Sequence, residues 1–389
     1  MDIALCYESV LPARGGCEHY ISDLARRLAR DGHAVHLYAS RWDANALPPT
    51  MHYHRLPAVG GPRFLRPWRF AKSVEDALRQ RRHDVTMGFD KTWGQDILYP
   101  QGGLHVASAA QNLLKNPPGI SRIFARWLKM FDPAARSFRQ LERKQYLSEK
   151  RPIILVNSRM VRQHFETYYE IPASDIHVLP AAIDPDRFAA EDRPKRRIEE
   201  RQRWGISNDE PVGLFVAMNY RLKGLAPLLH SLKYVDRSTR YRIAIVGSPR
   251  FESYERLATR LGVADKVKFL GFRADPKDAY FASDFLVHPT FYDPCSLVVL
   301  EALACGLPVI TTRYNGASEL FTHGKEGFVV DDPHDHRSLG SAISQLLDSP
   351  TRSSFASSAR QAAKRWTFEQ HYQQLLGYFE KAAGMRKAA

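Results

Sequence analysis

The chain has 389 residues, a length that predicts two domains of roughly 180 residues each. Apolar residues make up 44% and charged residues 25%, which is typical of a globular protein and excludes extensive disorder. The cysteines are scattered and form no CxxC pair, which excludes a disulfide framework or a cysteine zinc site and indicates a reducing compartment: Cys6, Cys17, Cys295 and Cys305.

The net charge of +14 indicates an acidic partner. Nucleic acid, anionic lipid and anionic sugar acceptors all fit a basic surface, and a chain that is simply basic is the alternative. The N-terminus carries Asp2 and Glu8 and no basic segment, so it is interpreted as a buried strand and not as a signal peptide. No apolar run approaches the roughly 18 residues that cross a bilayer. We therefore expect a cytoplasmic protein.

In the first half of the chain, short apolar runs alternate with longer segments of helical period, which predicts a parallel-sheet α/β domain. A helix is expected over about 18–30, directly after the loop that contains Gly15 and Gly16. Strands are expected at 3–7, within 31–40, at 84–89 and at 152–158.

The polar stretch at 190–203 has no apolar period and is interpreted as a linker. The alternating pattern then restarts, which predicts a second doubly wound domain. Its strands are expected near 212–218, 242–248, 267–272, 283–290 and 307–312, and its helices near 225–234, near 254–261 and from 297.

The predicted class is therefore α/β, with two doubly wound, Rossmann-like domains facing a central cleft. The first domain is expected over 1–190 and the second over 204–366. A final amphipathic helix over about 367–383 can pack back on the first domain, although its pattern alone does not fix its place. Ligands of such domains bind at the carboxyl ends of the strands.

The most informative segment is YDPCSLVVLEALACGLPVITT at 292–312. It predicts a loop, an apolar helix whose first turn holds Ser296, Leu297 and Val298, and a following strand. Free amides and the positive dipole end of that helix suit a diphosphate. Asp293 and Glu301 flank this point eight positions apart, and sugar hydroxyls are their natural partners. The alternative is a turn-forming Asp293 and a surface Glu301, but an ionised carboxylate in an apolar helix is costly without a specific partner.

These residues resemble the E-x7-E signature of the retaining glycosyltransferases of family 4, which have a GT-B fold. The resemblance covers nearly the whole chain and is closest to the bacterial lipopolysaccharide-core glucosyltransferase I group. It also rests on five further segments: Gly15 and Gly16 followed by Glu18, VNSRMV at 156–161, YRLKGL at 220–225, IVGS at 245–248 and VKFLGF at 267–272. Asp293 departs from the family, which usually has Glu at this position.

The resemblance implies a retaining hexosyltransferase that transfers a sugar to a lipid-linked or lipopolysaccharide-core acceptor at the cytoplasmic face of the inner membrane. The sugar that it favours is glucose from UDP-glucose. It implies that Asp293 holds the donor sugar and that Glu301 binds the ribose. Arg221 and Lys223 follow a strand end, where two cations can neutralise the diphosphate and stabilise the leaving group. A solvated basic turn is the alternative for that pair.

Weaker patterns add five candidate residues. Gly15 and Gly16 allow close backbone approach to a ligand, or form a plain turn. The resemblance suggests that His105, beside two glycines, contacts the donor sugar; a loop histidine with a structural role is an equal alternative. Phe272 and Arg273 can cover the base, or simply belong to a strand and its turn.

No HExxH or Cys/His spacing occurs, and the prediction includes no metal and no cofactor other than the nucleotide sugar itself as co-substrate. Three alternatives stay open: another GT-B nucleotide-sugar enzyme such as an epimerase or a phosphorylase, a non-catalytic nucleotide-sugar sensor, and a membrane scaffold. No nucleic-acid motif accompanies the positive charge.

An amphipathic helix is expected from Ile120, with the basic residues Arg122, Arg126 and Lys129 off its apolar face. That face consists of Ile120, Ile123, Phe124, Trp127, Leu128 and Phe131. A second basic and aromatic cluster lies at 63–72. Both patterns predict peripheral binding to an anionic membrane. The alternative is a helix that packs its apolar face on the domain core, with its cations as a solvated face.

Overall fold

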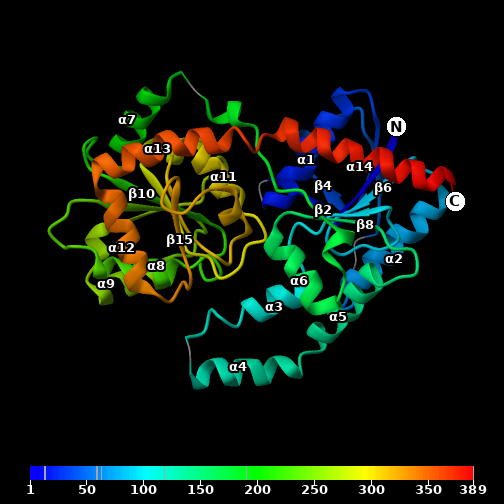
Figure 1. The fold of residues 1–389 in the computed structure, drawn as a ribbon, viewed down its shortest axis with the longest axis horizontal. Coiled ribbons are helices and arrows are strands. Elements are labelled where there is room, and N and C mark those ends of the chain that lie inside the picture. The colour runs from blue at the N-terminus through cyan, green and yellow to red at the C-terminus, as the bar shows by residue number, and fades with distance from the viewer. Residues whose placement is uncertain (13–14, 58–59, 63, 118, 190, 389) are drawn as a thin grey trace. The chain divides into compact units, whose positions relative to one another are not determined.

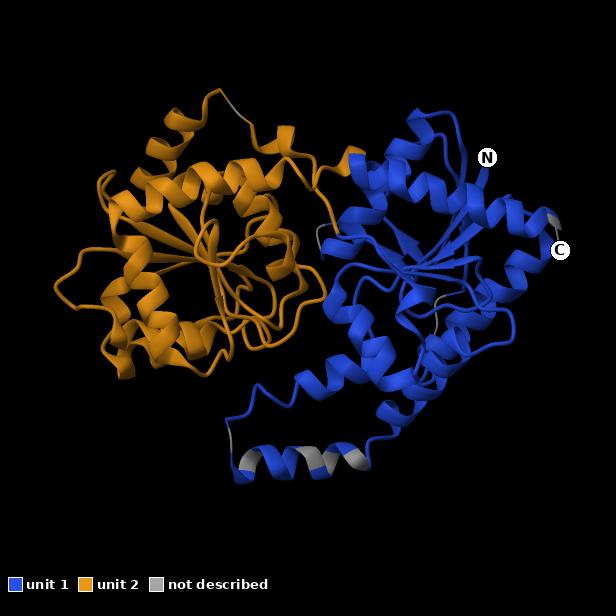
Figure 2. Ribbon diagram, viewed as in Figure 1, with its two compact units in different colours: residues 1–180, 370–389 blue, residues 181–369 orange. Residues whose placement is uncertain are grey.

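The computed structural model describes residues 1–12, 15–57, 60–62, 64–117, 119–189 and 191–388. The chain divides into two compact units (Figure 2): unit 1 comprises residues 1–180 and 370–389, and unit 2 comprises residues 181–369. The chain therefore passes from one unit to the other twice. Among the described residues, no helix is both long and apolar enough to cross a membrane.

Unit 1 is built on a seven-stranded sheet in the order β5-β3-β1-β6-β7-β8-β9. Neighbouring strands all pair in parallel. The strands are β1 (Asp2–Cys6), β3 (Ala34–Ala39), β5 (His52–Arg55), β6 (Val85–Gly88), β7 (Ile97–Leu98), β8 (Ile153–Val156) and β9 (Ile176–Val178). A separate parallel pair is formed by β2 (Ser9–Val10) and β4 (Arg41–Trp42).

Helices flank this sheet, except for the helix at Ile120–Met130, which stands apart from it (Figure 1). They are α1 (Gly16–Arg30), α2 (Arg66–Gln80), α3 (His105–Gln111), α4 (Ile120–Met130), α5 (Pro133–Tyr146) and α6 (Arg159–Tyr169). Helix α1 buries Tyr20, Leu24 and Leu28 because these residues recur every four positions on one face. Ser158 begins α6 by accepting a hydrogen bond from the Val161 amide at 3.2 Å.

The last helix, α14 (Phe368–Ala388), belongs to unit 1 from residue 370 onward. His371 Nδ1 donates to the Pro180 carbonyl at 2.8 Å, and its Nε2 lies 2.7 Å from the Tyr20 hydroxyl. Farther along, Arg386 donates to the His83 carbonyl at 3.0 Å. Tyr372, Leu375 and Phe379 are fully buried. These contacts make α14 part of the packing of unit 1.

Unit 2 contains a six-stranded parallel sheet in the order β12-β11-β10-β13-β14-β15. The strands are β10 (Val212–Ala217), β11 (Arg242–Gly247), β12 (Val267–Gly271), β13 (Phe285–His288), β14 (Val309–Thr312) and β15 (Gly327–Val330). The helices are α7 (Arg193–Trp204), α8 (Leu225–Ser231), α9 (Glu252–Leu261), α10 (Lys277–Ala282), α11 (Leu297–Ala304), α12 (His336–Leu347) and α13 (Ser349–Ala363). Two apolar clusters cover the sheet, so the predicted class of two doubly wound α/β domains is confirmed.

The interpretation of 190–203 as a linker is wrong from residue 193 onward, because Arg193–Trp204 is the helix α7, packed against α10. Residue 190 lies outside the described residues. A charged residue, Arg201, lies fully buried on the side of α7 that packs against the unit. It donates to Asp284 Oδ2 at 2.7 Å and to the carbonyls of Ala282 and Glu210 at 2.8 Å each. A buried arginine leaves no apolar period in the sequence, so the pattern predicted a linker.

Candidate active site

The best-defined polar site of unit 2 joins the segments that follow β10 and β13. Lys223 follows β10 and Asp293 follows β13, and these two strands are neighbours in the sheet. Lys223 Nζ lies 2.5 Å from Asp293 Oδ2. The side chains are only 21% and 14% exposed. Because carboxyl ends of adjacent parallel strands lie at one edge of the sheet, the fold brings together two residues 70 positions apart.

The backbone holds these two segments at close range. The Phe291 amide donates to the Leu222 carbonyl at 2.9 Å, and the Thr290 hydroxyl donates to the same oxygen at 3.2 Å. Gly224 has a φ of +82°, and a Cβ there would lie 2.0 Å from the Pro289 carbonyl oxygen. Only glycine therefore fits between Lys223 and α8 without displacing the segment after β13.

Asp293 carries a negative charge at neutral pH. Burial opposes its ionisation, but the charge of Lys223 and contact with His288 outweigh that effect and hold the pKa of Asp293 well below its usual range. His288 ends β13, with Nε2 3.9 Å from Asp293 Oδ2 and 3.4 Å from Ser296 Oγ. Burial lowers the pKa of His288, so its imidazole is neutral. His288 was not predicted from the sequence, although its place at the carboxyl end of a strand was a usable signal.

Helix α11 begins beside this pair. Ser296 caps it, and the Ser296 amide donates to Asn315 Oδ1 at 3.2 Å. Asn315 also donates to Thr311 Oγ1 at 3.0 Å, so the segment after β14 fixes the helix start. Leu297 and Val298 form the first turn, where the backbone amides have no partner within the helix. Those amides and the Lys223 ammonium supply positive charge to one region.

Glu301 lies in the middle of α11, half-buried between apolar residues. The Tyr280 hydroxyl donates to Glu301 Oε2 at 2.6 Å. Burial raises the pKa of Glu301, while the hydrogen bond from Tyr280 and the charge of Arg187, in the short helix η4 (Pro185–Phe188), act in the opposite direction. The carboxylate therefore has a protein partner, Tyr280, which was not predicted from the sequence.

Three other predicted residues belong to unit 2. Arg221 is exposed in the same loop as Lys223. Phe272 and Arg273 follow β12, which β11 separates from β10. Phe272 is about half exposed, and Arg273 Nη2 lies 3.3 Å from Glu200 Oε1 on α7. Arg273 thus has a structural partner within the unit.

Three predicted residues belong to unit 1. Gly15 caps α1 with an extended backbone, φ −178°, and Gly16 is the first residue of that helix. His105 begins α3, and its ring stacks on Phe138 with centroids 3.9 Å apart. The His105 amide donates to the Glu142 carboxylate.

His105 also lines a cavity of about 710 Å³ within unit 1, formed by residues of α3 to α6 and the segment after α3. Four cations contribute to its walls: Arg122, Lys129, Arg136 and Arg139. Leu113 and Leu114 add apolar surface. The cavity is therefore both basic and apolar.

Helix α4 stands apart from the sheet of its own unit (Figure 1). Its apolar side chains do not pack on the domain core, which contradicts the packed alternative for the side chains that the structure describes. Ile120, Ile123, Phe124 and Trp127, with Phe131 just after the helix, are each more than half exposed. The side chains of Arg126 and Leu128 lie outside the described set.

The solvated basic face that belongs to the packed alternative is also contradicted for two residues. Arg122 Nε donates to the Asn116 carbonyl at 2.9 Å, and Lys129 Nζ donates to the Ala109 carbonyl at 2.6 Å. Both cations therefore tie α4 to the segment that precedes it. In the second basic and aromatic cluster, at 63–72, the ring centroids of Trp68 and Trp93 lie 5.5 Å apart, and Phe70 is buried. Phe64 and Leu65 are exposed, and residue 63 lies outside the described residues.

Two family models match the chain. Residues 14–187 match "Glycosyltransferase Family 4", and residues 196–366 match "Glycosyl transferases group 1". The chain is 26% identical to the lipopolysaccharide glucosyltransferase WaaG of Escherichia coli K12 over 366 residues, covering 93% of this chain and 94% of that protein. It is 28% identical to the GDP-mannose-dependent α-(1-6)-phosphatidylinositol monomannoside mannosyltransferase of Mycolicibacterium smegmatis, covering 92% and 91%.

A solved structure supports the same likeness. The crystal structure of WaaG, a glycosyltransferase involved in lipopolysaccharide biosynthesis, matches with a TM-score of 0.81 at 25% sequence identity. The match covers 98% of this chain and 99% of that chain. Together with the two parallel sheets, it identifies the architecture as GT-B.

Proposed function

Because the chain belongs to the GT-B glycosyltransferases with a family 4 and a group 1 domain, we propose that it transfers a hexose from a nucleoside diphosphate sugar to a lipid-linked or lipopolysaccharide-core acceptor. The observation that carries this proposal is the Lys223–Asp293 pair beside the start of α11. It combines a cation, helix amides and a carboxylate within one region, which suits a diphosphate joined to a sugar.

In the proposed reaction, Lys223, Arg221 and the first-turn amides of α11 neutralise the diphosphate as it leaves. Asp293 accepts hydrogen bonds from hydroxyls of the donor sugar, and Glu301 accepts them from the ribose. The acceptor hydroxyl attacks from the leaving-group face, so the anomeric configuration is retained. A departing phosphate oxygen takes the acceptor proton. No metal is assigned to this step, since these groups supply the positive charge.

We favour UDP-glucose as donor and treat GDP-mannose as the rival, because the relatives include a glucosyltransferase and a GDP-mannose-dependent mannosyltransferase. The test is a screen of UDP- and GDP-sugars against the purified full chain, with nucleotide release measured with and without a glycolipid acceptor. Asp293→Asn serves as the matched inactive control. If no donor is turned over faster by the wild-type chain than by this variant, the proposed activity is refuted.

The basic cavity next to His105 supports a phosphorylated, amphiphilic acceptor, because it offers cations and apolar side chains together. Arg136 is exposed and lines it. Arg136→Ser should raise the KM for acceptor and leave the KM for donor unchanged. Equal KM values for acceptor in both proteins would argue against this cavity as the acceptor site.

We also propose that α4 binds the anionic surface of the cytoplasmic membrane. Its exposed aromatic residues suit the lipid interface, and the net charge of +14 suits anionic lipid. Because Arg122 and Lys129 bind backbone carbonyls of the segment before α4, a change in either would also disturb the placement of the helix, so the test variant is Phe124→Ser with Trp127→Ser. Ile198→Ser, an exposed apolar residue of unit 2, is the control.

Co-sedimentation with vesicles of anionic and zwitterionic lipid provides the measurement. Wild type and Ile198→Ser should bind anionic vesicles, less strongly as salt increases, and the double variant should stay in the supernatant. Binding without a preference for anionic lipid, or binding unaffected by the double variant, would contradict the proposal.

A further inference from the structure

The amino-terminal edge of the unit 1 sheet gathers three side chains that are strong metal ligands. Asp2 begins β1, His36 lies in β3, and His83 precedes β6. Each offers one ligand atom, and these atoms all lie within 4.8 Å of one another. The edge is the opposite end of the strands from the carboxyl ends, where doubly wound domains bind their ligands.

Asp2 is the common point of the cluster. His36 Nε2 lies 3.4 Å from Asp2 Oδ2, and His83 Nδ1 contacts Asp2 Oδ1 within hydrogen-bonding range. Ligand atoms in a tetrahedral zinc site are about 3.3 Å apart when each lies roughly 2.0–2.1 Å from the metal. The observed spacing of His36 and Asp2 thus already suits a shared ion, and His83 needs only a small side-chain adjustment.

Both imidazoles are oriented through their remaining nitrogen. His36 Nδ1 lies 2.9 Å from His54 Nε2, and His83 Nε2 lies 2.8 Å from the Tyr38 hydroxyl. If these outer nitrogens carry the protons, both inner nitrogens present lone pairs toward Asp2. A histidine that binds a metal normally has its other N–H hydrogen-bonded in this way.

A partner is missing at one inner nitrogen. Among the described residues, His36 Nε2 is buried and has no hydrogen-bond partner. If His83 Nδ1 carries a proton, it can donate that proton to Asp2. A proton on His36 Nε2 would not form a hydrogen bond with Asp2 in the observed geometry. An orphaned buried polar atom is costly, and a cation between His36 and Asp2 would pair it.

From this geometry we propose that Asp2, His36 and His83 bind a divalent cation of the zinc class, separate from the transfer reaction. Two imidazoles and one carboxylate suit zinc, with water as a further ligand. The side chains of His36 and His83 are fully buried, while that of Asp2 is 30% exposed and leaves a route for the ion. Arg81 Nη2, 3.4 Å from Asp2 Oδ2, has to move aside, which its 48% exposed side chain permits.

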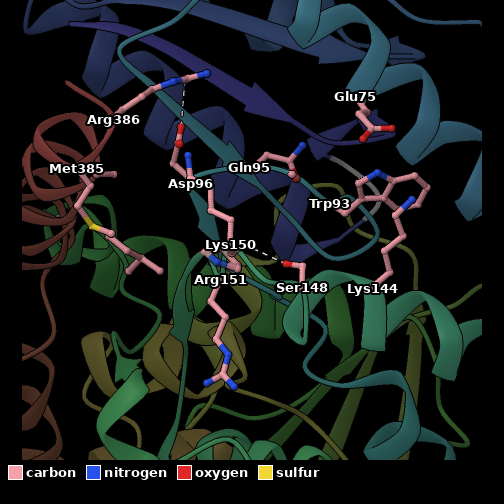
Figure 3. A pocket seen from close by; sticks show the side chains of 14 residues that line it. Glu75, Trp93, Gln95, Asp96, Lys144, Ser148, Lys150, Arg151, Met385 and Arg386 are labelled. Carbon is pink, nitrogen blue, oxygen red and sulfur yellow. Dashed lines mark hydrogen bonds and ion pairs between the residues drawn. The ribbon is translucent and has the colours of Figure 1, made fainter. Parts of the chain in front are cut away.

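The backbone around the cluster is fixed by elements distant in sequence. The Asp2 amide donates to Asp84 Oδ2 at 2.8 Å, and the Asp84 amide donates to the Asp2 carbonyl at 2.9 Å. Arg386 of α14 donates to the His83 carbonyl. It also pairs with Asp96, and Figure 3 shows this second contact. An ion here would cross-link β1, β3 and the segment before β6, so its binding should stabilise unit 1.

The test uses the full chain without a histidine tag, stripped with a chelator and titrated with Zn²⁺ by calorimetry. Co²⁺ replaces Zn²⁺ as a spectroscopic probe of tetrahedral coordination. We expect a single equivalent to bind and to raise the Tm. Tyr38→Phe keeps the buried ring but removes the bond to His83, and should weaken binding about 10–100-fold.

Two ligand variants and a control complete the experiment. Asp2→Asn and His83→Gln should abolish the saturable binding. His52→Gln is the control, because His52 stacks on His36 with centroids 4.4 Å apart but lies outside the ligand set. Circular dichroism of each metal-free variant checks the fold, and Tyr38→Phe decides the matter if a ligand variant fails to fold. The proposal is overturned if no saturable equivalent binds, or if Tyr38→Phe binds Zn²⁺ as tightly as wild type.

Discussion

Replacing Lys223 with methionine separates the folding role of the Lys223–Asp293 pair from its proposed catalytic role. Methionine keeps the apolar stem and removes the charge, so Asp293 loses the cation 2.5 Å away. Breaking a buried ion pair costs about 3–5 kcal/mol, and the partial exposure of both side chains and the remaining His288 contact reduce this to about 2 kcal/mol. Urea unfolding at pH 7 measures the loss.

The pH dependence gives an independent check with a definite sign. Because the pKa of Asp293 is held well below its usual range, its stabilisation is present above the ordinary aspartate value and is lost as the pH falls toward the folded pKa. In Lys223→Met that pKa should rise, so the stability difference from wild type should shrink as the solution becomes acidic.

Lys223→Met should reduce catalytic activity more strongly than it reduces stability. Charge on the diphosphate grows as the bond to the sugar breaks, so Lys223→Met should lower kcat about 100–1,000-fold, with a smaller change in the KM for donor. Initial rates of nucleotide release measure both constants. Adding Asp293→Asn should restore much of the stability but none of the activity, because it removes the unpaired charge. An unchanged kcat with reduced stability would show that Lys223 is structural.

Three further outcomes are expected. Glu301→Gln should leave the fold nearly intact and raise the KM for donor by one to two orders of magnitude, since a charge-assisted hydrogen bond contributes about 1.5–3 kcal/mol; unchanged donor affinity would remove Glu301 from the site. Initial rates should be unchanged by EDTA. A rate that falls in EDTA and is restored by Mg²⁺ would contradict the metal-free step. Burial raises the pKa of Glu142 to about 7 from the ordinary 4.5. The free energy of unfolding should therefore fall as the pH rises across that range. The fall is on the order of 3 kcal/mol and should be absent in Glu142→Gln; parallel urea profiles at pH 5 and pH 8 would refute it.

The local sequence pattern was enough to predict several of the buried strands. The apolar runs of β1, β8, β10 and β11 predicted the strands because buried parallel strands need continuous apolar side chains. By contrast, β5 has the sequence HYHR and β7 has two residues, so neither carries such a run. The helix α7 was missed for a related reason, since its buried contact is made by an arginine.

The residues of the candidate site also fall into those that local sequence could predict and those that it could not. Asp293, Ser296 and Glu301 lie within one short segment, so their spacing could be recognised directly. The contact between Lys223 and Asp293 depends on β10 lying next to β13, and strand order is not written in local sequence. His288 ends an apolar strand, so its position at the strand end was a usable signal, but its apolar neighbours also fit a residue of the core. Asp2, His36 and His83 come from separate segments, so no ligand spacing appears along the chain.

The return of α14 to unit 1 affects the order in which the protein is completed during synthesis. Unit 2 has all of its residues once position 369 has left the ribosome. Unit 1 begins first, but its Tyr20 and His83 lack their partners on α14 until residues 370–388 emerge. The unit translated first is therefore finished last, and until then the surface that receives Tyr372, Leu375 and Phe379 is open to chaperones and proteases.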